Sequence, residues 1–116
     1  MKTILVAEDN DSNFILMTYI LKKHYQLLRA RHGGEAVEMA ENPDVSMILM
    51  DIKMPVMDGL AATRAIREKH PDLPIIALTA NAFDSDREQA LAAGCTDFLS
   101  KPVSSDLCLR TIAKYI

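Results

Sequence analysis

The sequence predicts an α/β domain built on a doubly wound, five-stranded parallel sheet with five helices. Short apolar runs of strand length alternate along the chain with segments whose apolar residues recur at helical spacing. The run at 45–50 is apolar on both faces, which is typical of a parallel strand covered by helices on both sides. Little chain is left between these segments, so we expect one domain that spans residues 1–116.

Each element follows from a local pattern. The predicted strands are 3–7, a weaker run at 26–30, 45–50, 74–78 and 97–100. The predicted helices are 13–24, 34–41, 60–69 and 84–93, followed by a fifth helix near the C-terminus. In the first helix, Phe14, Met17 and Leu21 share one face. We expect Gly94 to close the fourth helix in a left-handed conformation and Ser104 to cap the start of the fifth.

Composition excludes several classes of protein. The 116 residues are 49% hydrophobic and 25% charged, as in a globular domain. With 13 basic and 16 acidic residues the net charge is -3, so we expect no direct nucleic-acid partner. No apolar run reaches membrane-spanning length, and Glu8 and Asp9 end the first run too early for a secretory signal. We therefore expect a cytoplasmic domain without membrane contact, whose Cys95 and Cys108 are reduced.

Polar residues follow four of the predicted strands at their carboxyl ends, where parallel α/β sheets bind ligands. They are Glu8 and Asp9, Asp51, Thr79 and Lys101. If the first and third strands are neighbours, three carboxylates meet in one crevice, and their mutual repulsion must be relieved by cations. Lys101 supplies one cation. Mg²⁺, which binds carboxylate oxygens, is the expected second cation.

These residues have the parts of a phosphoryl-transfer site. Asp51 is a candidate nucleophile, because a carboxylate can attack phosphorus and form an acyl phosphate. A metal held by Asp9 and Asp51 would take one phosphoryl oxygen, Lys101 a second and the hydroxyl of Thr79 a third, while Glu8 would act through water on the metal. Each residue alone also fits an ordinary loop, cap or surface role. Their coincidence at four strand ends favours a site.

Four segments, VAEDN, LMDIKMPVMDG, ALTAN and DFLSKP, together resemble the receiver domain of two-component response regulators over essentially the whole chain. Stretches such as MPVMDGLAATRAIRE are most similar to the receivers of hybrid sensor histidine kinases. The resemblance implies a flavodoxin-like fold with strand order 2-1-3-4-5 and phosphorylation of Asp51. It also implies Mg²⁺ bound by Asp9, Asp51 and the backbone carbonyl of Lys53, with Glu8 in the acidic pocket.

The resemblance further implies a cis peptide bond between Lys101 and Pro102 and a switch pair, Thr79 and Phe98. Phosphorylation would draw Thr79 inward, and the Phe98 ring would move into the vacated space and change the surface of the fourth helix, fifth strand and fifth helix. The implied partner is the dimerisation and phosphotransfer domain of a histidine kinase, or a histidine phosphotransfer protein. The domain itself would be a monomer or weak dimer.

Three other functions stay open. A phosphohydrolase with an aspartate nucleophile usually has a second aspartate two residues on, where this chain has Lys53. A nucleotide-binding fold expects a glycine-rich first turn, but residues 8–13 are acidic and polar. A pseudo-receiver would act as an interaction module without phosphorylation. We expect a signalling domain, not an enzyme beyond its own phosphoryl transfer and slow autodephosphorylation, with Lys53 and Asn81 placed to gate the attacking water.

Overall fold

The computed structural model describes residues 1–80 and 84–116, in which strands and helices alternate along the chain. The strands are β1 (Thr3–Ala7), β2 (Gln26–Ala30), β3 (Val45–Asp51), β4 (Ile75–Thr79) and β5 (Asp97–Ser100). The helices are α1 (Asp11–Leu21), α2 (Gly33–Met39), α3 (Gly59–Lys69), α4 (Asp84–Ala93) and α5 (Ser105–Ala113). The strands pair in parallel in the order β2-β1-β3-β4-β5, so the predicted fold and strand order are confirmed.

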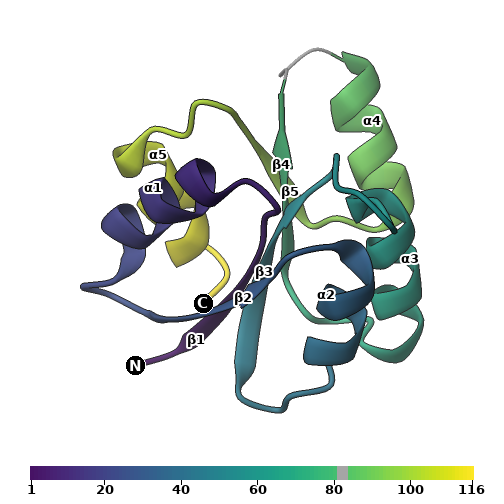
Figure 1. Cartoon of the computed structure of the whole chain (residues 1–116), viewed down its shortest axis with the longest axis horizontal. Coiled ribbons are helices and arrows are strands. Elements are labelled where there is room, and N and C mark those ends of the chain that lie inside the picture. The colour runs from purple at the N-terminus through teal and green to yellow at the C-terminus, as the bar shows by residue number, and fades with distance from the viewer. Residues whose placement is uncertain (81–83) are drawn as a thin grey trace.

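The sheet is covered on both faces (Figure 1). Helices α1 and α5 lie on one face, and α2, α3 and α4 lie on the other. Alternate residues of β1 enter opposite cores: Ile4 and Val6 pack under α1 and α5, whereas Leu5 and Ala7 pack on the other side. The central strands are therefore apolar throughout, because both of their faces are removed from water. None of the helices in the described ranges is long and apolar enough to cross a membrane.

Some predicted element ends were wrong by a few residues. The first helix begins at Asp11, not at 13, because the side chain of Asn10 caps it by accepting a hydrogen bond from the backbone N–H of Asn13. It ends at Leu21, and the second helix is also displaced, to 33–39. Strand β3 runs on to Asp51, and β4 is 75–79 instead of 74–78. Asp51 and Thr79 thus belong to the hydrogen-bonded sheet itself, as does Phe98 in β5.

The ends of three elements are joined by Arg67, a half-buried residue of α3. Its guanidinium donates to the carbonyl of Gly94 through Nε at 2.9 Å and Nη2 at 2.7 Å. Its Nη1 donates to the carbonyls of His70 at 2.9 Å and Leu73 at 2.6 Å. Gly94 has a φ of 112°, the left-handed conformation predicted for the residue that closes α4. One side chain therefore ties the ends of α3 and α4 to the segment before β4.

The remaining local predictions concern a cap and the two cysteines. Ser104 caps α5, its side chain accepting a hydrogen bond from the backbone N–H of Leu107. Cys95 and Cys108 are both free and buried, as expected of small apolar side chains in a core. Burial raises the pKa of the Cys108 thiol to about 11, which keeps this thiol protonated and unreactive.

Candidate functional site

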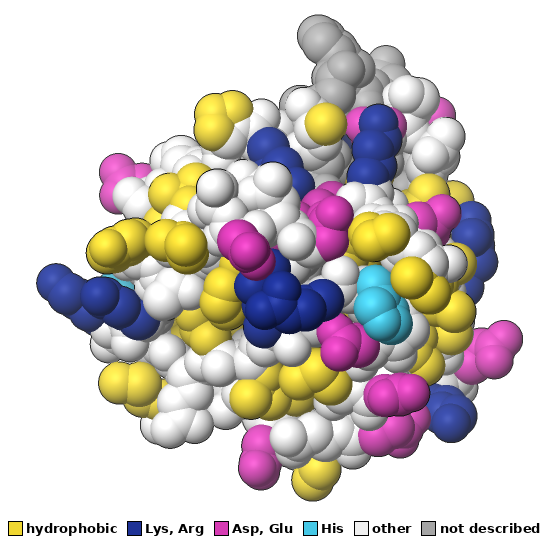
Figure 2. Space-filling view, in the orientation of Figure 1, with side chains coloured by type: hydrophobic (Ala, Val, Ile, Leu, Met, Phe, Trp, Pro, Cys, Tyr) yellow, Lys and Arg dark blue, Asp and Glu magenta, His cyan; other side chains and the backbone are white. Residues whose placement is uncertain are grey.

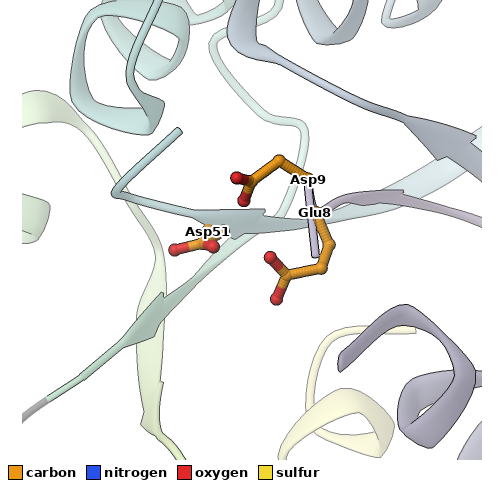
Figure 3. A group of neighbouring side chains, drawn as sticks. All are labelled: Glu8, Asp9 and Asp51. Carbon is orange, nitrogen blue, oxygen red and sulfur yellow. The ribbon is translucent and has the colours of Figure 1, made fainter. Parts of the chain in front are cut away.

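Three carboxylates converge at the carboxyl edge of the sheet. Strands β1 and β3 are neighbours, so Glu8 and Asp9, which follow β1, lie beside Asp51 at the end of β3. One oxygen from each of the three side chains lies within 4.8 Å of the others (Figure 3). Glu8 and Asp51 are buried, whereas Asp9 is exposed. The crevice expected from the strand ends is present, with one of its acids open to solvent.

Both carboxylate oxygens of Asp51 accept hydrogen bonds. Oδ1 accepts a hydrogen bond from the backbone N–H of Lys53 at 3.1 Å, and Oδ2 accepts one from Nζ of Lys101 at 3.0 Å. The first residue of α3 packs on the same strand end. A Cβ added to Gly59 would lie 2.1 Å from the carbonyl oxygen of Asp51, so only glycine allows this approach. The Asp51 carboxylate is therefore fixed in direction as well as in place.

Lys101, which follows the edge strand β5, brings a positive charge to the cluster. Its Nζ lies 3.0 Å from both Asp51 Oδ2 and Glu8 Oε1, and its backbone N–H donates to the carbonyl of Thr79 at 2.7 Å. The Lys101–Pro102 peptide bond is cis. Burial lowers the pKa of Lys101, but its contacts with the Glu8 and Asp51 carboxylates outweigh burial and raise that pKa above its usual value. The ammonium group thus stays charged in the pocket.

Glu8 is the electrostatically costly member of the cluster. Burial, with its contact to Asp51, raises the pKa of Glu8 from 4.5 to about 7, although Lys101 acts in the opposite direction. Its Oε1 lies 3.0 Å from Lys101 Nζ without the geometry of a hydrogen bond, and no other described residue donates to it. Three carboxylates with a single ammonium group beside them still carry excess negative charge, which suits a hard divalent cation such as Mg²⁺.

An open cleft gives solvent access to this cluster. Its volume is about 470 Å³, and it lies between the segment that follows β3 and the first turns of α4. Asp9, Lys53 and Asp58 are on its wall, together with Asp86 and Gln89 of α4. The backbone of Lys53 is beside the cluster, because its N–H bonds to Asp51. Asp9 and Lys53 are therefore both placed where a cation entering from solvent would meet them.

Thr79 and Phe98 lie next to this site but not within it. Thr79 is fully buried, and its hydroxyl donates to the carbonyl of Leu99 on β5 at 3.5 Å. Phe98 is half-buried on β5, and the guanidinium of Arg87 lies 5.4 Å from the centre of its ring. Asn81, the second residue expected to gate water, lies outside the described residues. The hydroxyl of Thr79 thus faces β5 in this structure.

Sequence reasoning missed Arg29, a residue of β2. Its guanidinium donates to the carbonyl of Glu8 through Nε and Nη2, both at 3.1 Å, and to the carbonyl of Asp9 at 3.4 Å. It also forms an ion pair with Asp11 at 2.9 Å. A lone arginine in a weak strand gives no signal in the sequence, because its partners are backbone groups about twenty residues away. Gly59 carried a signal only as part of the MDG segment.

The fold and the pocket define a parallel α/β domain with a carboxylate cluster and one lysine at the carboxyl edge of its sheet. Residues 4–113 match the family described as the response regulator receiver domain. The chain therefore belongs to the response regulator receiver family, and the resemblance found in its motifs is confirmed.

Relatives of known identity include proteins of two-component systems. The chain is 42% identical over 118 residues to two-component system protein A of Emericella nidulans, a match that covers 98% of this chain and 17% of that protein. It is 45% identical over 107 residues to hybrid signal transduction histidine kinase G of Dictyostelium discoideum, covering 86% of this chain and 3% of the kinase. The chain thus spans only a small part of each of these relatives.

Solved structures of receiver domains superpose closely on this chain. The receiver domain of the sensor histidine kinase PA1611 of Pseudomonas aeruginosa, solved with a magnesium ion coordinated in its active-site cleft, has a TM-score of 0.91 and 40% identity. That match covers 98% of this chain and 96% of the other. The receiver domain of Saccharomyces cerevisiae Ssk1, solved with the histidine phosphotransfer protein Ypd1, has a TM-score of 0.91 and 30% identity, covering 97% and 87% of the two chains.

Proposed function

We propose that this chain is a phosphoacceptor signalling domain that takes a phosphoryl group from a phosphohistidine onto Asp51 in a Mg²⁺-dependent reaction. One observation carries the proposal. The Asp51 carboxylate is fixed through both oxygens by Lys53 and Lys101, in a pocket with two further carboxylates. Such a group is a nucleophile held rigidly beside a cation, which is the arrangement that phosphoryl transfer to a carboxylate requires.

The reaction involves one bond formed and one broken. An oxygen of Asp51 attacks phosphorus, and the phosphorus–nitrogen bond of the phosphohistidine breaks. The electron pair goes to the imidazole nitrogen, which takes up a proton, and Asp51 becomes an acyl phosphate. The charged amine of Lys101, 3.0 Å from Asp51 Oδ2, would neutralise part of the charge that the phosphoryl oxygens carry. The domain would thus act on its own side chain, and water would later release the phosphate slowly.

The residues that would hold Mg²⁺ are Asp9, Asp51 and the backbone carbonyl of Lys53, with Glu8 buried behind them. When bound, the ion would withdraw negative charge from the phosphoryl oxygens. Two observations support this choice of ion: the purely carboxylate character of the cluster, and the single lysine that faces its three acids. The magnesium ion in the PA1611 receiver structure is a precedent for such a cleft.

The switch that we propose starts at Thr79. In the structure its hydroxyl donates to the Leu99 carbonyl at 3.5 Å, a long and replaceable bond. A phosphoryl group on Asp51 would offer a charged acceptor and draw the hydroxyl toward the pocket. The ring of Phe98, which is half-buried beside Arg87, would then move inward and alter the surface of α4, β5 and α5.

The partner would dock beside the pocket. Helix α1 exposes three large apolar side chains, Ile15, Leu16 and Tyr19. Leu16 lines a small pocket together with Lys101 and the residues that follow it. Figure 2 shows hydrophobic side chains on the side of the molecule where Figure 1 places α1 and α5. We propose that a phosphohistidine-bearing domain contacts this surface, and the Ypd1–Ssk1 complex supports this class of partner.

The test is intact-mass spectrometry after incubation with phosphoramidate, whose phosphorus–nitrogen bond resembles that of phosphohistidine. We expect one added phosphoryl group that requires Mg²⁺ and is lost in Asp51→Asn. Asp58→Asn is the matched control, because Asp58 lines the same cleft but caps α3, and asparagine is an equally good cap.

An adduct that persists in Asp51→Asn would show that the acceptor is another residue. A folded wild-type chain that binds Mg²⁺ but forms no adduct would indicate a receiver that accepts a phosphoryl group only from its kinase. A folded chain with neither adduct nor Mg²⁺ binding would refute the phosphoacceptor role and leave the phosphorylation-independent interaction module.

A further inference from the structure

The two acids that follow β1 differ in how they are held. Glu8 is buried, and its backbone N–H donates to the carbonyl of Ala30 on β2 at 3.0 Å. Asp9 is exposed, and it comes after the last residue of the strand. The direction in which an exposed side chain leaves a strand-to-helix connection depends on how its backbone is held, and connections are the more mobile parts of a fold. The question is what keeps the Asp9 carboxylate within the cluster.

Arg29 supplies that constraint from the neighbouring strand. Three of its N–H contacts go to the backbone of the acidic pair: two to the carbonyl of Glu8, both at 3.1 Å, and one to the carbonyl of Asp9 at 3.4 Å. Two successive carbonyls that point to one guanidinium fix the orientation of the peptide group between them.

The guanidinium is itself held on two other sides. It lies over the ring of Phe14, 4.6 Å from the ring centre, and pairs with Asp11 at 2.9 Å. Its side chain is only 15% exposed. In Figure 2, basic side chains lie beside acidic ones at the centre of the face. Because the side chain has packed and charged partners on several sides, Arg29 is a rigid support and not a mobile surface arginine.

We propose that Arg29 is a positioning residue, which holds the backbone of Glu8 and Asp9 so that the Asp9 carboxylate stays directed at Asp51 for Mg²⁺ binding. The inference rests on the proposed function, in which this cluster binds the metal. Arg29 touches neither the carboxylates of the cluster nor the phosphoryl acceptor by any hydrogen bond in the described structure. Its effect is exerted through the backbone alone.

The sign of the effect separates positioning from simple electrostatics. A positive charge near a cation site repels the cation, so loss of that charge should by itself tighten Mg²⁺ binding. Loss of a positioning residue should weaken Mg²⁺ binding, because the carboxylates are no longer held in the binding arrangement. The two explanations therefore predict opposite changes in the dissociation constant.

The experiment is a Mg²⁺ titration of the unphosphorylated chain, followed by calorimetry or by amide chemical shifts. We expect Arg29→Met to raise the dissociation constant roughly tenfold, as is typical when a group that orients metal ligands is removed. The dissociation constant of Arg29→Lys should fall between those of wild type and Arg29→Met, because an ammonium group can bind one carbonyl but cannot bind two as the guanidinium does. Arg31→Met is the matched control. Arg31 also pairs with Asp11, at 3.4 Å, so this substitution removes the same charge from the same neighbourhood.

An unchanged or lower dissociation constant in Arg29→Met would overturn the positioning role, and so would an equal weakening in Arg31→Met. If Arg29→Met does not fold, Arg29→Lys decides: wild-type affinity in that variant would overturn the proposal. A wild-type chain that binds no Mg²⁺ would instead refute the metal site of the proposed function, and the inference with it.

Discussion

At each end of the sheet an arginine binds backbone carbonyls, but the groups around the two arginines differ in charge. At the amino end, Arg67 donates to the carbonyls of Gly94, His70 and Leu73, which are neutral groups that gain from a charged donor. At the carboxyl end, Arg29 holds the backbone of two acids that themselves crowd a third. The first arrangement stabilises the fold, whereas the second supports a cluster that is unfavourable in the absence of a cation.

The difference shows how one fold separates stability from chemistry. The connections at the amino end are held together by Arg67 and contain none of the clustered carboxylates. The carboxyl-end connections must hold Glu8 and Asp51 away from water, where burial already raises the pKa of Glu8 to about 7. A substitution at the amino end should therefore change stability but not Mg²⁺ affinity, whereas stability at the carboxyl end should depend on the charge of Glu8. The following three variants are ordered by the size of their expected effect on stability.

The largest expected effect is at the amino end. Arg67→Met should lower the free energy of unfolding by about 3 kcal/mol, because several half-buried carbonyls lose a charged donor. Chemical denaturation measures this change, and the melting temperature should fall by roughly 10 °C. The Mg²⁺ affinity of the folded variant should be unchanged.

Arg64→Met, at an exposed position of the same helix, is its control and should leave stability nearly unaltered. A weaker Mg²⁺ affinity in Arg67→Met would contradict the separation of the two ends.

The second effect is the pH dependence of stability in metal-free protein. The folded-state pKa of Glu8, about 7, lies above its ordinary value of 4.5. Between these values the folded chain binds more protons than the unfolded chain, so the free energy of unfolding should fall as pH rises from 5 to 8. We expect Glu8→Gln to remove about 2 kcal/mol of this fall, measured by denaturation at both pH values without Mg²⁺. Glu38 is an exposed acid, so Glu38→Gln should leave the pH dependence of stability as it is in wild type.

The same slope in Glu8→Gln as in wild type would show that burial of this acid is not what destabilises the carboxyl end.

The smallest effect concerns the loop after β3. Val56 has a φ of 68°, a left-handed conformation that is unfavourable for a β-branched residue, and it is 88% exposed. Val56→Asn should raise the free energy of unfolding by about 1 kcal/mol, because asparagine adopts this conformation more readily and little burial is lost. Val56→Ile keeps the β-branch and should behave as wild type. Equal stability of the three proteins would show that no strain is relieved at this position.

Much of the fold and of the pocket follows from the sequence, for a physical reason. Parallel strands buried on both faces give continuous apolar runs, and in such a sheet the polar residues that end the runs lie at a shared edge. This is why Glu8, Asp51 and Lys101 could be placed together before their distances were known. The order of the strands came from the motif resemblance, since the alternation of strands and helices does not determine it.

Most of what could not be predicted depends on contacts distant in sequence, although the start of α1 is a local exception. Arg29 and Arg67 bind backbone carbonyls, and a carbonyl leaves no trace in the identity of its residue. The start of α1 was misplaced because Asn10, between two aspartates, gives no unique sign of which residue caps the helix. The direction of the Thr79 hydroxyl, toward Leu99, likewise depends on the packing of β4 against β5.

The contact between Gly59 and Asp51 has a mechanical consequence. Because a Cβ on Gly59 would lie 2.1 Å from the Asp51 carbonyl oxygen, the first turn of α3 rests directly on the backbone of β3. No side chain separates the two segments at this point, so α3 cannot approach β3 any further. Helix α3 therefore blocks any movement of the Asp51 backbone toward it, and a displacement of this strand end has to take another direction.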